Sequence, residues 1–209
     1  MHQTLVLGVV LVTLVGCSPD AETERLRRTV RTEYDAETGR LSQITYDSND
    51  DGNVDTWTYM DGTRIIRVEI DRDEDGILDR WEYYDEASVI QKVGISRVND
   101  GRPDAWMFPD GAGEIARIEV STRRDDVVDR WEWYEQGALV RAEEDADRDG
   151  RPDKWDTYRD GKVASTAFDE DGDGTPDRRL SYGAEGQLVT IELAPDAQGH
   201  YTETIEVEP

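Results

Sequence analysis

Four segments of the chain place acidic oxygens at every second residue, a pattern suited to holding a metal ion. In each nine-residue segment, Asp or Asn stands at places 1, 3 and 5, Gly at place 6 and Asp again at place 9. A hard cation with about six to eight oxygen ligands requires such spacing and a Gly that allows a sharp backbone turn. We therefore predict Ca²⁺ as the cofactor. The candidate ligands are Asp47, Asn49, Asp51 and Asp55; Asp71, Asp73, Asp75 and Asp79; Asp145, Asp147, Asp149 and Asp153; and Asp169, Asp171, Asp173 and Asp177.

Two further segments with the same spacing separate metal ligands from simple turn residues. Places 5 and 9 are Asp in all six units, so Asp there can serve a turn alone. Places 1 and 3 become Ser96 and Val98 in the third unit and Ser121 and Arg123 in the fourth. Each unit has acidic or amide oxygens at both of these places or at neither, as expected for ligands of one ion. We predict three or four ions, in the second, fifth, sixth and first units. The third and fourth should be empty, with Arg123 and Arg124 supplying positive charge in the fourth.

The loops resemble the EF-hand calcium loop, whose twelve-place form ends in a bidentate Glu. Residues 71–82 match that form in full and end in Glu82, while residues 145–156 match it with Asp156 at the last place. The resemblance therefore adds Glu82 and Asp156 to the candidate metal ligands. Residues 47–58 and 169–180 end in Thr58 and Leu180, which implies weaker binding there. The flanks depart from an EF-hand, because β-prone residues follow the loops where a helix should begin, with Trp-x-Tyr after the first and second loops.

Three loops also carry Pro at place 8, giving the order Gly-x-Pro-Asp. In this respect they are similar to the aspartate-rich calcium loops of thrombospondin type 3 repeats. The residues concerned are Pro103, Pro152 and Pro176.

The elements that position these loops repeat every 24 or 25 residues. Trp57, Trp81, Trp106, Trp131 and Trp155 mark the period, and a second aromatic residue follows two places later in the first four units. An aromatic pair at i and i+2 lies on one face of a strand. A second two-residue alternation of apolar residues precedes each of the first four loops. Each unit is therefore predicted to be a pair of strands.

Short Gly-containing turns join the two strands of a unit, as in a β-hairpin. The predicted fold class is all-β: tandem 24–25-residue hairpin repeats forming an antiparallel meander or a β-solenoid. We expect residues 1–16 to be a signal peptide, residues 17–31 a lipidated Cys and polar tether, and residues 32–209 a β-repeat domain with six acidic-loop units and terminal caps. Stacked repeats need such caps.

The N-terminus reads as a targeting segment. Residues 4–16 carry no charge, and a helix of that length would span about 20 Å, short of the roughly 30 Å hydrocarbon core. The run ends in Leu14-Val15-Gly16-Cys17, which resembles the lipobox of bacterial lipoproteins. The resemblance implies lipidation of Cys17, the only Cys, and hence a membrane anchor in the cell envelope. Ser18 after the Cys favours the outer membrane of a Gram-negative cell.

Composition excludes some functions and leaves others open. Lys and Arg number 24 against 49 Asp and Glu, a net charge of −25, which excludes nucleic-acid binding through a basic face. We found no G-x-S-x-G, phosphate-cradling Gly loop or His pair for zinc, so we expect no enzyme and no catalytic residue. The expected function is a non-enzymatic, lipid-anchored, calcium-stabilised scaffold or interaction module with an unknown protein or polysaccharide partner. The alternative is a glycan or cell-wall-binding module whose exposed Trp and Tyr hold sugars or choline, as in the cell-wall-binding hairpin repeats that W-x-Y-Y resembles.

Overall fold

The computed structural model describes residues 20–196 and 198–208. They form a single open antiparallel sheet in which every strand pairs with its neighbours in sequence. The predicted all-β hairpin meander is confirmed, and the sheet stays open instead of closing into a solenoid. The strands are β1 (Val30–Tyr34), β2 (Leu41–Tyr46), β3 (Thr56–Asp61), β4 (Arg64–Ile70), β5 (Arg80–Tyr84), β6 (Ile90–Ile95), β7 (Ala105–Pro109), β8 (Ile115–Val120), β9 (Arg130–Glu135), β10 (Ala138–Glu144), β11 (Lys154–Arg159), β12 (Lys162–Phe168), β13 (Arg178–Tyr182), β14 (Leu188–Pro195) and β15 (Tyr201–Glu206).

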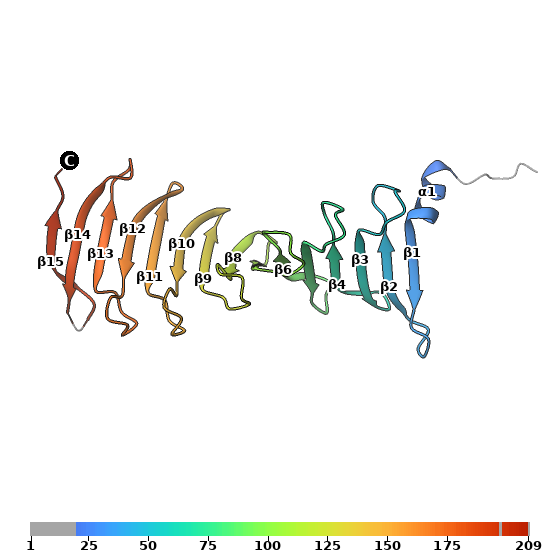
Figure 1. Cartoon of the computed structure of the whole chain (residues 1–209), viewed down its shortest axis with the longest axis horizontal. Helices are drawn as coiled ribbons and strands as arrows, with labels where there is room; N and C mark the ends of the chain where they lie inside the picture. The colour runs from blue at the N-terminus through green and yellow to red at the C-terminus, as the bar shows by residue number, and fades with distance from the viewer. Residues whose placement is uncertain (1–19, 197, 209) are drawn as a thin grey trace, which may run out of the picture.

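The sheet is elongated, with β1 and β15 at opposite ends (Figure 1). At about 4.8 Å between strands, its 15 strands span about 65 Å. The strand direction turns along this axis, so that β6–β8 are seen nearly edge-on while the two ends present a face. Such twist is the ordinary consequence of right-handed strand geometry.

One short helix precedes the sheet. Helix α1 (Ala21–Thr29) begins at Asp20, whose carboxylate accepts a hydrogen bond from the Thr23 N–H at 2.8 Å. Strand β1 starts at Val30, so both the helix and the start of the sheet lie within the segment expected as a tether. In the described part of the chain, no helix is long and apolar enough to cross a bilayer. The signal segment and Cys17 lie outside the described residues.

The sheet is a single layer, so its core consists of side-chain rows running across the strands. One face, called here the aromatic face, alternates Trp with Glu: Trp57 pairs with Glu69, Glu69 with Trp81, and beyond them Glu119 lies between Trp106 and Trp131. The opposite face carries the row that includes Val68, Val93, Ile118, Ala142 and Thr166. Among the described residues no large side chain is fully buried. Stability therefore rests on cross-strand pairs, each of about 0.2–1 kcal/mol, and on the backbone ladder.

Candidate metal centres

All six acidic loops lie along one side of the sheet, where β2 and the later even-numbered strands end; this side is called here one edge of the sheet. They connect β2 to β3, β4 to β5, β6 to β7, β8 to β9, β10 to β11 and β12 to β13. Alternate connections of a meander fall on the same edge, so the tight hairpin turns occupy the other edge. The sheet therefore lines up the loops in a row, which the 24–25-residue period alone implied.

The six loops share one backbone conformation. Places 4 and 6 have positive φ in every unit, including the non-Gly residues Asp50, Glu74, Asn99, Arg124 and Arg148 at place 4. A left-handed residue beside right-handed ones turns consecutive N–H groups toward one point, which suits an acceptor. The Asp71 carboxylate accepts there from the N–H groups of Asp75 at 3.2 Å and Gly76 at 2.8 Å.

Serine can perform the same turn function without a charge. In the third loop, Ser96 Oγ accepts from the Asp100 N–H at 3.1 Å, and in the fourth, Ser121 Oγ accepts from the Asp125 N–H at 3.2 Å. The loop shape therefore requires only one oxygen at place 1. A carboxylate at that place brings a charge and a second oxygen beyond what the turn needs.

Place 9 fixes the other end of each loop. The Asp79 carboxylate accepts from the Arg72 N–H at 2.8 Å, and Asp177 accepts from the Glu170 N–H at 2.7 Å; all six loops repeat this bond from place 2. Each such bond uses one carboxylate oxygen. The loop ends are well shielded, since Asp55 is 6% exposed and Asp71 is also 6% exposed.

Three clusters of carboxylates result, in the second, fifth and sixth loops. In each, places 1, 3 and 9 offer one oxygen, and the three oxygens lie within 4.8 Å of one another. Three formal negative charges at this separation repel one another in the absence of a cation. Hard oxygen donors in such a cluster can hold a metal ion, and the predicted clusters are present in these three loops. They are Asp71, Asp73 and Asp79; Asp145, Asp147 and Asp153; and Asp169, Asp171 and Asp177.

The aspartates at place 5 stand beside these clusters and form turns. One oxygen of Asp75 accepts from the Ile77 N–H at 2.9 Å, and one oxygen of Asp173 accepts from the Thr175 N–H at 2.8 Å. Asp51 and Asp149 accept in the same way from the residue two places later. Hydrogen bonds from Thr175 lower the pKa of Asp173, and the backbone bond from Asn53 lowers that of Asp51.

The two place-12 candidates lie in strands, away from the clusters. Glu82 is in β5, where its oxygens bond Arg80 Nε at 2.7 Å and the Tyr84 hydroxyl at 2.6 Å. Asp156 is in β11 and is bonded by Lys154 Nζ at 2.9 Å and the Thr166 hydroxyl at 2.6 Å. A strand exit directs the third residue after place 9 onto a sheet face, whereas an EF-hand exit would be helical.

The first loop differs because its place 3 is Asn49. The Asn49 amide oxygen accepts from the Asp51 N–H at 2.9 Å, and its nitrogen donates to Asp51 at 3.3 Å and to Glu74 of the second loop. Asp47 accepts from Gly52 at 2.8 Å, and Asp55 accepts from Ser48 at 2.7 Å. The first loop therefore holds the common shape with its place-3 amide turned toward carboxylates.

Arg123 bonds the next loop instead of the fourth loop, which it was expected to neutralise. Arg123 donates to the Ala146 carbonyl of the next loop at 2.7 Å. The cation that bonds Asp125 is Arg148 from the fifth loop, and this pairing lowers the pKa of Asp125. The side chain at place 4 projects from its own turn, so it meets the preceding loop.

This bridge by place 4 was not foreseen from the sequence, and it recurs along the row. Asp50 accepts from Arg28 of α1 at 2.7 Å, Glu74 meets Asn49 of the first loop, and Asn99 donates to Asp73 at 3.0 Å and to Asp75 at 2.7 Å. The sequence did offer one signal of this contact: place 4, between the candidate ligand places 3 and 5, carries a non-Gly residue in five of the six loops. Its partners depended on the stacking of adjacent loops.

The space between the first and second loops is strongly acidic. It measures about 570 Å³ and is lined by carboxylates without a basic side chain. The carboxylates are Asp51, Asp55, Asp71, Glu74 and Asp75.

Several aromatic rings of the aromatic face are covered by neighbouring cations. The Arg67 guanidinium lies 4.3 Å from the centre of the Tyr59 ring, and Arg141 lies 4.2 Å from that of Trp133. Lys92 lies 4.3 Å from the Trp106 ring centre, and Arg117 covers Phe108 in the same way. These contacts contribute about 0.5–1 kcal/mol each at exposed sites, and they occupy ring faces on which a sugar would stack.

No family model matches the chain, and no curated protein matches it. Among solved structures, S. aureus TarM in complex with Fondaparinux, alpha-GlcNAc-glycerol and UDP is similar over 50% of this chain, with 13% identity and a TM-score of 0.37. The accessory secretory protein 1, 2 and 3 structure from Streptococcus pneumoniae is similar over 62%, with 11% identity and a TM-score of 0.39. The chain spans 22% of the length of each of these two chains.

Proposed function

We propose that the protein is a non-enzymatic, calcium-stabilised β-repeat scaffold or interaction module of the cell envelope. The observation that carries this proposal is the presence of three carboxylate clusters at places 1, 3 and 9 along one edge of a single-layer sheet. Such a sheet has little interior to offset repulsion within its loops. Divalent ions would neutralise the clusters and fix the edge.

Calcium is the ion favoured by the donor set. The clusters offer only oxygens, the loops alternate their ligands, and place 5 keeps one carboxylate oxygen outside its turn bond. Calcium accepts about six to eight oxygens in flexible geometry, whereas magnesium demands a near-ideal octahedron. The resemblance to EF-hand and thrombospondin type 3 loops supports the same ion. Three ions would occupy the second, fifth and sixth loops, and a fourth would occupy the first.

The lipid on Cys17 would attach this scaffold to a membrane, in our proposal the outer membrane of a Gram-negative bacterium. Helix α1 begins four residues after Cys17 and is tied to the first loop, where Arg25 donates to the Ser48 carbonyl at 2.7 Å and Arg28 pairs with Asp50. The anchor would therefore sit at the β1 end. The rest of the sheet would reach up to about 65 Å from it, and a protein or polysaccharide partner would bind along that length.

Thermal unfolding of the purified mature chain tests the metal proposal. An ion that binds only the folded state at 100 times its dissociation constant contributes about 2.7 kcal/mol. Calcium should raise the melting temperature strongly relative to EGTA, and magnesium at the same concentration should raise it less. Equal melting in calcium and in EGTA would refute the proposal.

The anchor is tested separately in cells. Labelled palmitate should be incorporated into the full-length protein, and Cys17→Ala should abolish both incorporation and membrane association. Ser18→Ala is the matched control, because it preserves the acylated residue. Incorporation that persists in Cys17→Ala would exclude this anchor.

A further inference from the structure

The repeat pattern is broken in one region, the fifth and sixth units. In the first four units, the residue two places after the repeat Trp is aromatic and lies on the aromatic face. In the last two it is Thr157 or Ser181, and a Tyr stands one place later. Tyr158 and Tyr182 stand two residues after Asp156 and Leu180, so strand alternation puts their side chains on the opposite face. Tyr84 and Tyr134 hold the same position in the second and fourth units.

Neither Tyr158 nor Tyr182 has, two residues earlier in its strand, the glutamate that fixes its counterpart. In β5 and β9, the hydroxyls of Tyr84 and Tyr134 donate to Glu82 and Glu132 two residues earlier in the same strand. The corresponding residue before Tyr158 is Asp156, whose oxygens are bonded by Thr166 and Lys154. Before Tyr182 it is Leu180.

Tyr158 and Tyr182 line an open hollow of about 680 Å³ across β11, β12 and β13. Its lining combines three aromatic rings, Tyr158, Phe168 and Tyr182, with the polar groups of Asp156 and Thr166. A hollow of this size is within the range that holds small organic ligands. It lies on the face opposite the Trp rows.

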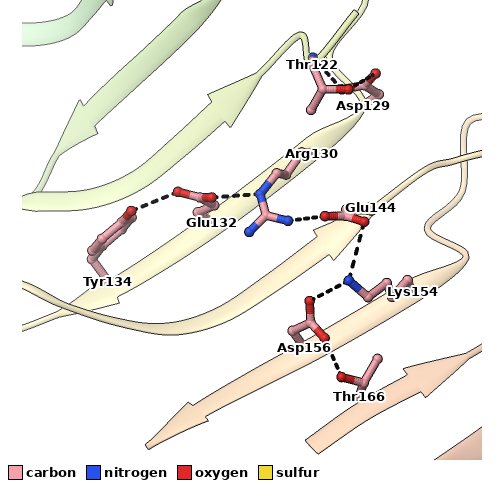
Figure 2. A network of polar contacts seen from close by, with 9 residues as sticks. All are labelled: Thr122, Asp129, Arg130, Glu132, Tyr134, Glu144, Lys154, Asp156 and Thr166. Carbon is pink, nitrogen blue, oxygen red and sulfur yellow. Dashed lines mark hydrogen bonds and ion pairs between the residues drawn. The ribbon is translucent and has the colours of Figure 1, made fainter. Parts of the chain in front are cut away.

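The charge of the lining is opposite to that of the molecule. Three cations, Arg130, Lys154 and Lys162, face one carboxylate, Asp156, although acids outnumber bases 49 to 24 in the whole chain. Figure 2 shows how two of these cations are held: Arg130 bonds Glu132 and Glu144, and Lys154 bonds Glu144 and Asp156. This network immobilises the floor of the hollow.

Lys162 is the cation left for a ligand. Its ammonium donates to the Ala184 carbonyl at 2.8 Å, a bond that holds it at the hairpin-turn end of the hollow. Within the part of the chain that the structure describes, no carboxylate pairs with it, in contrast to Lys154. An ammonium has three donors, so two remain.

We propose that this hollow binds a carboxylated sugar of the uronic-acid class, with its ring stacked on Tyr158 or Tyr182 and its carboxylate bonded by Lys162. Aromatic rings match the apolar face of a pyranose, and the immobilised Lys154–Asp156–Thr166 groups match its hydroxyls. The Lys162 ammonium matches one negative charge. The site does not use the acidic loops, so this proposal can be tested independently of metal binding.

Calorimetric titration of the calcium-loaded protein with a glucuronic-acid-containing disaccharide tests this site, and the methyl ester of the same disaccharide is the matched neutral probe. We expect the acid to bind at least about 10-fold more tightly than the ester, because a charged hydrogen bond is lost in the ester. Lys162→Gln should remove that difference. Lys92→Gln, on the aromatic face, should preserve it.

Two variants of Tyr182 distinguish loss of binding from loss of folding. Tyr182→Leu should weaken both probes, while Tyr182→Phe, which keeps the ring, should retain most of the binding with an unchanged melting temperature. Equal affinity for acid and ester, binding that survives Lys162→Gln, or absence of binding to either probe would overturn the proposal. Carboxylate capture by a loop-bound calcium ion would survive Lys162→Gln, so that variant also separates the two sources.

Discussion

The side-chain amide of Asn99 donates a hydrogen bond to Asp73 at 3.0 Å, across the boundary between the third repeat and the second. The same nitrogen donates to Asp75 at 2.7 Å, and the buried amide oxygen has no hydrogen-bond partner among the described residues. A loop without carboxylates at places 1 and 3 therefore reaches into the carboxylate cluster of its neighbour. This contact couples the two repeats. Whether it stabilises or destabilises the fold should depend on the charge at residue 99.

Asn99→Asp should separate the metal-free and metal-bound states of the second loop. Without metal, a third carboxylate beside Asp73 and Asp75 should destabilise the fold by about 0.5–1 kcal/mol. With calcium, the additional oxygen should strengthen binding, so the gap between melting temperatures in calcium and in EGTA should widen. Gln91→Glu adds the same charge at an exposed site of β6 and should leave the gap unchanged. An equal effect of the two substitutions would refute the coupling.

Asp147→Asn should reduce the number of bound ions by one. Asp147 Oδ1 accepts from the Asp149 N–H at 3.0 Å, a bond that Asn can keep, so the substitution removes charge from the fifth cluster without removing the turn. Calcium stoichiometry measured by calorimetry should fall by one, or one site should weaken at least about 10-fold. Asp160→Asn, in a hairpin turn at the opposite edge, should change neither quantity. An unaltered stoichiometry and affinity in Asp147→Asn would count against this cluster.

Most of the fold could be predicted from the 24–25-residue period of the sequence. Trp57 and its successors set the strands, and the position of each acidic loop between them set one edge for all six, because both follow from alternation along a single chain. The clustering of Asp71, Asp73 and Asp79 also followed from spacing within one loop.

Contacts between adjacent repeats could not be predicted from the sequence period. Asn99 meets Asp73, and Arg148 meets Asp125, because adjacent loops stack with place 4 projecting backward. Glu82 was a candidate ligand by position in a twelve-place loop, yet a strand exit turns it toward Arg80. The face of Tyr158 follows from alternation after Trp155, but the hollow that it shares with Phe168 and Tyr182 was not predicted.

Gly94 lies in the Trp–Glu row of the aromatic face at a point where an added side chain would collide with its neighbours. It lies between Trp81 and Trp106, and a Cβ there would come within 2.8 Å of the Trp106 ring and 3.0 Å of Pro103. Gly94→Ala should destabilise the fold by about 1–3 kcal/mol, as overpacking does. Gly111→Ala, where nothing lies within 4 Å, should have little effect. Urea unfolding of the two variants in calcium measures the difference, and equal stability would show that Trp106 moves aside freely.

Tyr134→Phe should change how stability responds to alkaline pH. The Tyr134 hydroxyl donates to Glu132 at 2.8 Å, and burial together with that carboxylate raises the pKa of Tyr134 from 10.0 to about 12. A group whose pKa is raised on folding contributes stability that is present below pH 10 and is lost as the pH rises to 12. Replacing it with Phe should flatten part of the fall in unfolding free energy across that window, and a late tyrosine absorbance step should disappear. Tyr34→Phe, at a side chain 63% exposed, should leave the fall as steep as before. If Tyr134→Phe also left it as steep, the hydroxyl would not be held by Glu132 in the folded protein.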